Sequence, residues 1–399
     1  MKDLKRQIIN IFKKTDRTDW KPVKFGDIAF NISERIDPNN TDAKIYVGLE
    51  HLDSDSIHIH RLGIPSDVKG VKLRVYKGDI IFGKRRAYQR KASVAEFDGI
   101  CSAHAMVLRA NPENIDPNFF PFFLHSDTFM NRAIEISEGS LSPTIKWKVL
   151  EHQEFLLPPR SVQKKLSEIL WKIDELEQKF RISYGEFLAL RLSYLVKSFS
   201  SASKNAVPLG KLPINTINGL WKSEDHDSIE VKVIRSTEFL NFGEINLSEL
   251  KPLLVSSKKF EKSKLISGDI IIERSGGGPK QPVGRVCYFD LDDDNYSFSN
   301  FTSIIRVEDK DVLYPKYLFY FLEVFYERGL TDRIQKQTTG IRNLDYDLYL
   351  STKVPLPDIK RQIEIVSQID EIELNRRSLS KQIEQTRTLR NVAVNNIFI

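Results

Sequence analysis

Residues 78–81 read Gly-Asp-Ile-Ile, and residues 268–271 read Gly-Asp-Ile-Ile again. Each copy precedes a loop that carries Lys or Arg. Three further pairs of similar segments follow in the same order. They are Phe97-Asp98 and Phe289-Asp290, SAHAMVLR at 102–109 and SNFTSIIR at 299–306, and the aromatic segments NFFPFFL at 118–124 and KYLFYFL at 316–322. An ordered series that occurs twice indicates two diverged copies of one domain.

Each copy ends in a proline-marked exit that leads into a long helical pattern. The exits read FLLPP at 155–159 and VPLP at 354–357. After them, apolar residues recur at alternating steps of three and four, which is the spacing of a heptad seam. The predicted interface residues are Ile169, Ile173, Leu176, Phe180, Phe187 and Leu190 in the first helix, and Ile365, Ile369, Ile372, Leu379 and Ile383 in the second. Charged residues, including Arg191, are predicted to occupy the other faces.

A helix of roughly forty residues is about 60 Å long, which is longer than the core of one small domain requires. We therefore expect the two helices to pair with each other, antiparallel and within one chain. Two alternatives stay open, namely that each helix packs on its own half or that the helices form a homodimer. The predicted fold is α+β, with two pseudo-symmetric domains of mixed sheet and helices separated by two long antiparallel coiled-coil helices.

The predicted boundaries follow the repeat and the helices. Residues 1–158 form the first domain, 159–203 the first long helix with a Ser- and Lys-rich linker, 204–355 the second domain, and 356–399 the second long helix. Apolar residues at helical spacing also predict a short helix over residues 4–14.

Composition excludes several classes of protein. A chain of 399 residues with 41% hydrophobic and 29% charged residues is long and apolar enough for two or three folded domains. Two cysteines are too few for a disulfide framework or a zinc site. The chain has no run of about 18 apolar residues, which a membrane span would need, and no signal peptide is recognisable. We therefore expect a cytoplasmic protein. The net charge of +6 permits a polyanionic partner.

Four segments resemble catalytic motifs without completing them. GGGPKQ at 276–281 lacks the hydroxyl residue that a phosphate loop places after its lysine. His58 and His60 have no evident third metal ligand and are predicted to be surface histidines. DPNF at 116–119 departs from the tetrapeptide of amino-methyltransferases. Asp292-Asp293-Asp294 with Glu308 and Lys310 weakly imitates a metal-dependent nuclease. No catalytic or metal site is predicted, although the nuclease stays open as one alternative and a non-reading assembly scaffold as another.

Basic loops follow the repeated strand in both halves. Residues 84–91 read KRRAYQRK, and residues 273–285 read ERSGGGPKQPVGR. Arg can bridge two acceptors of guanine and Gln can bridge adenine, whereas Lys contacts phosphates. We therefore predict that these loops, with two polar loops further along, bind double-stranded DNA. The predicted DNA-binding residues are Lys84, Arg85, Arg86, Tyr88, Gln89, Arg90, Lys91, Ser140, Lys146, Arg274, Lys280, Gln281, Arg285, Thr338, Thr339 and Arg342.

The exits LLPPRSVQKKLSEILWKIDEL at 156–176 and VPLPDIKRQIEIVSQIDEI at 354–372, together with the repeated strand and the variable basic loops, carry a family resemblance. From Trp20 to its end, the chain resembles the specificity subunit of Type I restriction-modification systems. The interval from Gln163 to Asp174 is three residues longer than that from Gln362 to Asp370, which affects only the local register.

This resemblance implies two target recognition domains, each reading one half of an asymmetric, bipartite DNA site. It also implies that the two helices hold the readings at a fixed spacing and dock two methyltransferase subunits that carry S-adenosylmethionine. A restriction and translocase subunit using ATP and Mg would complete the complex. The chain itself would be a non-catalytic subunit without a cofactor, in a prokaryotic cytoplasm.

Overall fold

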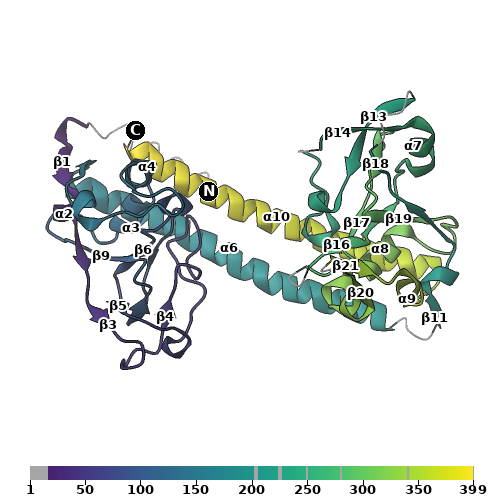
Figure 1. Ribbon diagram of the computed structural model, residues 1–399, viewed down its shortest axis with the longest axis horizontal. Coiled ribbons are helices and arrows are strands. Elements are labelled where there is room, and N and C mark those ends of the chain that lie inside the picture. Colours follow the sequence, from purple (N-terminus) through teal and green to yellow (C-terminus); the bar gives the residue numbers. More distant parts are fainter. Residues whose placement is uncertain are drawn as a thin grey trace. The chain divides into compact units, whose positions relative to one another are not determined.

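The computed structural model describes residues 17–201, 205–222, 227–248, 250–278, 281–338 and 341–398 (Figure 1). The predicted helix over residues 4–14 lies outside them. The chain divides into two compact units. Unit 1 comprises Met1–Ser183 and Leu379–Ile399, and unit 2 comprises Tyr184–Ser378. Each unit therefore contains one half of each long helix, because α6 spans Arg160–Ser201 and α10 spans Ile359–Phe398.

From residue 17 on, the described part of unit 1 contains two four-stranded sheets and one antiparallel strand pair. The first sheet has the order β2 (Ala29–Ile32), β9 (Met106–Ala110), β6 (Ile80–Phe82) and β7 (Ala92–Val94). The second has the order β3 (Arg35–Ile36), β5 (Lys72–Val75), β8 (Gly99–Cys101) and β4 (Tyr46–Val47), with β4 and β8 parallel. The pair joins β1 (Lys21–Lys24) to β10 (Glu154–Leu157). The short helices are η1 (Arg17–Asp19), α2 (Phe25–Ile28), η2 (Pro65–Asp67), η3 (Ala87–Gln89), α3 (Phe120–Leu124), α4 (Asp127–Glu135) and α5 (Trp147–Leu150).

Unit 2 repeats this architecture with additions. Its four-stranded sheet has the order β12 (Ile214–Asn218), β19 (Thr302–Val307), β15 (Ile270–Glu273) and β17 (Val286–Tyr288). A second sheet joins β14 (Pro252–Ser256), β13 (Ser228–Ile234) and β18 (Tyr296–Phe298), with β13 and β18 parallel. The third joins β16 (Ser275–Gly277), β21 (Ile341–Leu344) and β20 (Gln335–Thr338), and β11 (Ala206–Pro208) pairs with β22 (Lys353–Pro355). The helices are η5 (Leu209–Lys211), η6 (Ser236–Glu238), η7 (Asn241–Gly243), α7 (Ser257–Ser263), α8 (Pro315–Glu327), η8 (Leu330–Ile334) and α9 (Tyr346–Leu350).

The repeated Gly-Asp-Ile-Ile segment has the same structural role in both units. Gly78 and Gly268 have φ of +94° and +103°, a backbone conformation that glycine adopts without strain. The next residue is a buried aspartate that pairs with an arginine of the neighbouring strand. Asp79 lies 2.7 Å from Arg109, and Asp269 lies 2.7 Å from Arg306. The isoleucines then form a central core strand. The motif therefore encodes a turn, a buried aspartate that forms an ion pair, and a strand.

A glutamine fixes the start of each long helix against its own unit. The Gln163 side chain accepts a hydrogen bond from the Asp116 backbone N–H (2.7 Å) and donates to the Pro158 carbonyl (2.8 Å). Gln362 makes equivalent bonds to the Tyr314 N–H and the Pro357 carbonyl. Both glutamines are buried. The Pro-to-Gln spacing of the sequence thus reflects a helix anchor that satisfies backbone groups at the domain exit.

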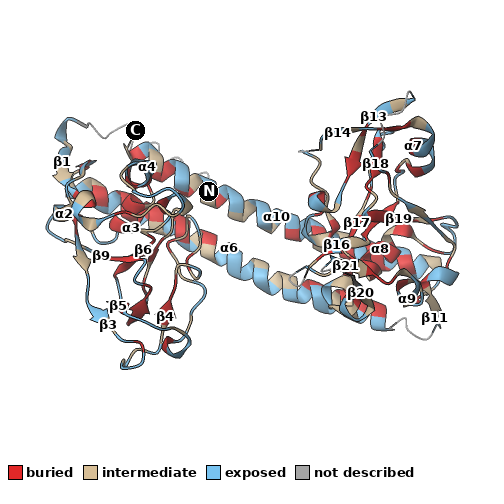
Figure 2. Ribbon diagram, viewed as in Figure 1, coloured by how far each residue is buried: buried red, intermediate tan, exposed pale blue. Residues whose placement is uncertain are grey.

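Within each unit, the first half of one long helix packs antiparallel against the second half of the other. In unit 1, Leu170 and Ile173 of α6 share a core with Val394 and Ile397 of α10. In unit 2 the shared core contains apolar residues of both helices, namely Leu195, Phe199, Ile365, Val366 and Ile369. The same halves also pack on the sheets and aromatic helices of their unit, so red buried faces run along them (Figure 2). The predicted antiparallel pairing is confirmed.

The predicted seam is right near the helix starts and wrong further along α6. Ile169, Ile173, Ile365 and Ile369 are buried, whereas Leu190 is 64% exposed. The remaining predicted positions are half-buried, namely Leu176, Phe180, Phe187, Ile372, Leu379 and Ile383. A straight helix turns once every ~3.6 residues and drifts away from a heptad repeat. Arg191, which we expected on an outer face, therefore returns to the face of Ile173 and is only 2% exposed.

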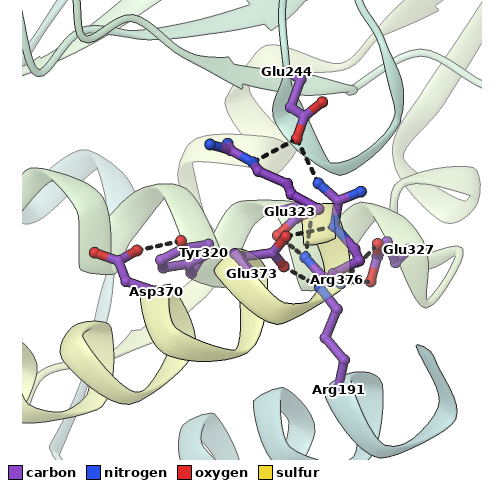
Figure 3. A network of polar contacts seen from close by, with 9 residues as sticks. Arg191, Glu244, Tyr320, Glu323, Glu327, Asp370, Glu373 and Arg376 are labelled. Carbon is purple, nitrogen blue, oxygen red and sulfur yellow. Dashed lines mark hydrogen bonds and ion pairs between the residues drawn. The ribbon is translucent and has the colours of Figure 1, made fainter. Parts of the chain in front are cut away.

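Buried charges occupy this corrected seam in unit 2 (Figure 3). Arg191 pairs with Glu373 of α10 and with Glu323 (2.7 Å) and Glu327 (3.1 Å) of α8. Arg376 pairs with Glu373 (2.7 Å) and with Glu244. Burial raises the pKa of Glu323 to about 8, although the charge of Arg191 opposes this shift. The network ties three helices together through one guanidinium.

None of the described helices is long and apolar enough to cross a membrane.

Candidate nucleic-acid interface

In unit 1 the loop after β6 lies beside the loop that precedes α5. The Arg86 N–H donates to the Pro143 carbonyl (2.7 Å), and the Ile145 N–H donates to the Lys84 carbonyl (2.9 Å). Arg86 and Arg90 flank η3 with left-handed backbone conformations. Ser140, which precedes these anchors in the second loop, is exposed, as is Tyr88. The structure thus brings together two loops that the sequence predicts to bind DNA.

A pocket of about 340 Å³ opens beside these loops. Four predicted residues line it, namely Arg85, Arg86, Gln89 and Lys91. The Arg85 Nε donates to Ser142 (2.6 Å) and the Lys91 Nζ donates to the Leu49 carbonyl (2.7 Å). Among the described residues, the side chains of Arg86 and Gln89 have no hydrogen-bond or ion-pair partner. These two are therefore available to a ligand.

The same pocket has residues that the sequence analysis missed. Leu49 and Glu50 come from the loop after β4, and Ser102 and His104 come from the loop after β8. The parallel pairing of β4 with β8 places these loops side by side. Neither loop carries a charge cluster in the sequence, so only the pairing of the two strands could have identified them.

Arg90 belongs to the scaffold rather than to the pocket, which corrects its predicted role. Its guanidinium pairs with Asp55 (2.6 Å) and Asp127 (2.9 Å) and donates to the His125 carbonyl (2.9 Å). These contacts tie the loop after β6 to the start of α4. Because they occupy the guanidinium, Arg90 can stabilise the loop but is not free to read a base.

A second pocket of unit 1, of about 430 Å³, contains three cations: Arg35, Lys84 and Lys146. Lys146 pairs with Glu138 (2.6 Å). Burial lowers the pKa of Lys84, because desolvation disfavours the charged ammonium. A phosphate group placed here would offset that cost. Trp147 contributes an aromatic wall to the same pocket.

Unit 2 carries the same arrangement with different side chains. The Arg274 carbonyl accepts from the Leu344 N–H (2.8 Å), as the Lys84 carbonyl does from Ile145. Arg274 therefore corresponds to Lys84. Its guanidinium lies over the Tyr346 ring, 3.9 Å from the centroid, and donates to Asn218 (3.0 Å). Tyr346 comes two residues after Leu344, just as Trp147 comes two residues after Ile145. An aromatic ring therefore accompanies the cation in both units.

An ion pair is also repeated, with its charges exchanged. Glu138 and Lys146 pair in unit 1, and Lys336 and Asp345 pair in unit 2 (2.6 Å). The backbone frame is thus common to both units while the polar groups on it differ. Such a difference suits two domains that contact different sequences.

Arg285 is a second predicted residue that the structure assigns to the scaffold. It pairs with buried Glu273 (2.8 Å) and donates to the Ser236 carbonyl (2.9 Å). Gln281, with its amide oxygen turned toward Arg285, accepts from the same guanidinium (2.8 Å). These contacts explain why a Glu, a Gln and an Arg occur in this loop.

Arg342 on β21 stays a candidate, since no side-chain partner of it is found in the part of the chain that the structure describes. Lys280 and Thr339 lie outside the described residues, as does the side chain of Thr338.

Near Arg274, Trp221 is 67% exposed and Phe301 45% exposed, with ring centroids 6.4 Å apart. A large exposed aromatic pair is a further candidate contact that a pattern of charges cannot reveal.

Two carboxylates of the nuclease alternative have cationic partners. Asp293 pairs with Lys232 (3.3 Å) and Asp294 with Lys264 (3.0 Å). Within the described ranges, no three His, Cys, Asp or Glu residues are grouped so that they could hold a metal ion. His58, predicted to be a surface residue, instead bonds Asp174 (2.5 Å) and is largely buried. These groups form structural contacts.

Comparisons with known proteins identify the family. A family model described as the Type I restriction modification DNA specificity domain matches residues 18–182 and 214–386. The chain is 23% identical over 335 residues to the Type I restriction enzyme StySPI specificity subunit of Salmonella potsdam, covering 78% of this chain and 69% of that protein. It is 23% identical over 329 residues to the EcoKI specificity subunit of Escherichia coli K12, covering 75% and 66%.

Two solved structures share the fold. One, from work on complex assembly and conformational transition of the Type I system, aligns with a TM-score of 0.57 at 20% identity, covering 94% of this chain and 96% of the other. The S subunit from M. genitalium aligns with a TM-score of 0.56 at 14% identity, covering 96% of both chains. With two matched copies of the domain in one polypeptide, the chain belongs to the Type I restriction-modification DNA specificity family.

Proposed function

We propose that this chain is the DNA-reading subunit of a Type I restriction-modification complex, and that each unit reads one half of an asymmetric, bipartite site. One observation carries the proposal. In both matched halves, a cation follows the repeated Gly-Asp-Ile-Ile strand and lies beside an aromatic ring. The cation is Lys84 in one half and Arg274 in the other, and the polar groups around the two cations also differ. A common frame with different contact groups supports two different readings.

The proposed partners are double-stranded DNA, two methyltransferase subunits and restriction subunits, in a prokaryotic cytoplasm. The names of the relatives, each a specificity subunit of a Type I restriction enzyme, support this assembly. We assign catalysis to the partners. S-adenosylmethionine would then belong to the methyltransferase, and ATP with Mg to the restriction subunit, with no cofactor in this chain. Its part is to position those subunits on DNA.

Genome-wide mapping of methylated adenine, with and without the gene, tests the proposal. We expect one bipartite methylated motif to disappear when the gene is deleted and to return with the wild-type chain. Replacing residues 204–355 by those of another family member should change one half of the motif and keep the other. Loss of both halves from a folded, assembled complex would contradict modular reading, and an unchanged methylation map would contradict the proposed function.

A further inference from the structure

The pocket of about 340 Å³ in unit 1 contains one carboxylate among its cations. Glu50 lines it together with Arg85, Arg86 and Lys91. DNA affinity depends largely on cations that contact phosphates, and a negative charge at such a surface opposes that attraction. The presence of Glu50 in this pocket is therefore not explained by a contribution to DNA affinity.

The carboxylate of Glu50 is not neutralised by its neighbours. Glu50 is exposed. Within the described residues, its carboxylate forms no ion pair and no hydrogen bond. Two of the three nearby cations are directed to other acceptors, since Arg85 donates to Ser142 and Lys91 to the Leu49 carbonyl, and Arg86 makes no ion pair with Glu50. Glu50 thus retains its acceptor capacity inside a basic pocket.

A glycine leaves space for this carboxylate. A Cβ atom on Gly48 would lie only 2.0 Å from the Glu50 Oε1, so the carboxylate occupies space that any other residue at position 48 would fill. Gly48 is buried and held in a turn, because its N–H donates to the His51 ring (3.1 Å) and its carbonyl accepts from the His51 N–H (3.1 Å). The turn therefore fixes the backbone that carries Glu50 at the end of β4, and Gly48 leaves room for its carboxylate.

We propose that Glu50 is a specificity-determining residue that accepts a hydrogen bond from the exocyclic amino group of a base in the major groove. The donor is the N4 amino group of cytosine or the N6 amino group of adenine. Guanine O6 and thymine O4 are acceptors at the corresponding edge, so the carboxylate repels them and rejects those bases. Arg86 and Gln89 supply donors beside it. This inference rests on the proposed function and adds an acceptor to its reading surface.

The test uses the full-length chain purified with its methyltransferase subunits. The DNA probes are a duplex carrying the mapped methylation motif, duplexes with each single base-pair substitution, and a duplex without the motif. Fluorescence anisotropy gives Kd for each probe at several salt concentrations. With Glu50→Gln we expect tighter binding to the duplex without the motif, because a repulsive charge is removed. We also expect discrimination at one base pair to fall roughly fivefold or more.

The base pair whose discrimination falls identifies the donor. A loss at a cytosine position assigns the N4 amino group, and a loss at an adenine position assigns the N6 amino group. Glu113→Gln is the matched control, since it removes the same charge from an exposed loop of unit 1 outside the pocket. Gly48→Ala keeps the charge and displaces the carboxylate, so it should reduce discrimination at the same base pair without tightening the binding of the duplex that lacks the motif.

Two results would overturn the inference. One is unchanged discrimination at every base pair with Glu50→Gln. The other is a discrimination profile of Glu50→Gln that Glu113→Gln reproduces. If the wild-type complex itself does not prefer the motif duplex, the proposed function fails instead, so the two failures are distinguishable.

Discussion

The guanidinium of Arg390 in the second half of α10 lies 2.8 Å from the carboxylate of Asp174 in the first half of α6. Unit 2 contains the counterpart, in which Arg191 of α6 pairs with Glu373 of α10. Asp174 and Glu373 occupy equivalent positions, because each is the same number of residues from the start of its helix. Arg191 and Arg390 are equivalent in the same way. Both copies thus keep one buried ion pair with the roles of the helices exchanged. Such pairs can fix helix register, as polar groups do in coiled coils.

Replacing Arg191 by Met should strongly destabilise unit 2. The substitution leaves Glu323, Glu327 and Glu373 without their shared cation, and breaking a buried ion pair costs about 3 kcal/mol or more. Urea unfolding measures the change. Lys179→Met, which removes an exposed pair with Glu175, is the control and should have little effect. Equal losses in the two variants would show that the buried network does not stabilise the unit.

His58 should make the stability of unit 1 depend on pH. Burial disfavours its charged form, but the hydrogen bond and charge of Asp174 outweigh burial and raise its pKa. A raised pKa adds stability that is complete below the ordinary value of about 6.5 and is lost as pH rises through the folded-state pKa. We therefore expect His58→Asn to lower the melting temperature more at about pH 6 than at about pH 9.

The control for this experiment is His60→Asn, which replaces an exposed histidine two residues away, and the effect of His58→Asn is measured relative to it. At acidic pH, His125 gives the stability of unit 1 a pH dependence of the opposite sign, and both variants retain this histidine. Burial lowers the pKa of His125 to about 4, so its contribution to stability is lost as pH falls from about 6.5 toward 4. A His58→Asn effect that grows with rising pH would refute the assigned contact with Asp174.

Arg86 and Arg90 should separate DNA binding from stability. Arg86→Gln removes a cation with no partner in the described structure, so DNA affinity should fall and the salt dependence should decrease by about one counterion. Arg90→Gln breaks contacts with Asp55, Asp127 and His125, so it should lower the melting temperature. Anisotropy and calorimetry measure the two effects, with Arg61→Gln as a surface control. DNA affinity unaffected by Arg86→Gln would remove that residue from the interface.

Ile397→Ala should destabilise unit 1 and spare unit 2. Ile397 is buried in the core that α10 shares with α6, and truncating a buried Ile costs about 2 to 5 kcal/mol. Val392→Ala on an exposed face of the same helix is the matched control. Hydrogen exchange resolves the two units separately. A uniform loss of protection across both would contradict the assignment of Ile397 to unit 1.

The sequence predicted those features that short segments encode. Gly78 and Asp79 form a local turn and a strand start, and Gln163 anchors a helix within a few residues of Pro158. Repetition in the second half made these signals recognisable. The seam was predictable only near the helix starts, because the heptad assumption drifts and because Arg191 and Glu373 place charges where apolar residues were expected.

The DNA-binding residues were harder to predict, since the role of a cation depends on partners distant in the chain. Arg90 and Arg285 have the same sequence signature as Arg86, yet acidic residues of other elements occupy them. Glu50 has no unusual neighbours in the sequence and enters the pocket only through the pairing of β4 with β8. Contacts of this kind require the fold.

The division of the chain into units determines the order in which its cores can close during synthesis. Unit 2 is continuous, from Tyr184 to Ser378, but unit 1 needs residues 379–398 to cover Leu170 and Ile173 of α6. The ribosome makes that covering segment only after all of unit 2. The domain translated first is therefore the last to be completed, and its nascent apolar helix face is covered only once residues 379–398 are made or a chaperone binds it.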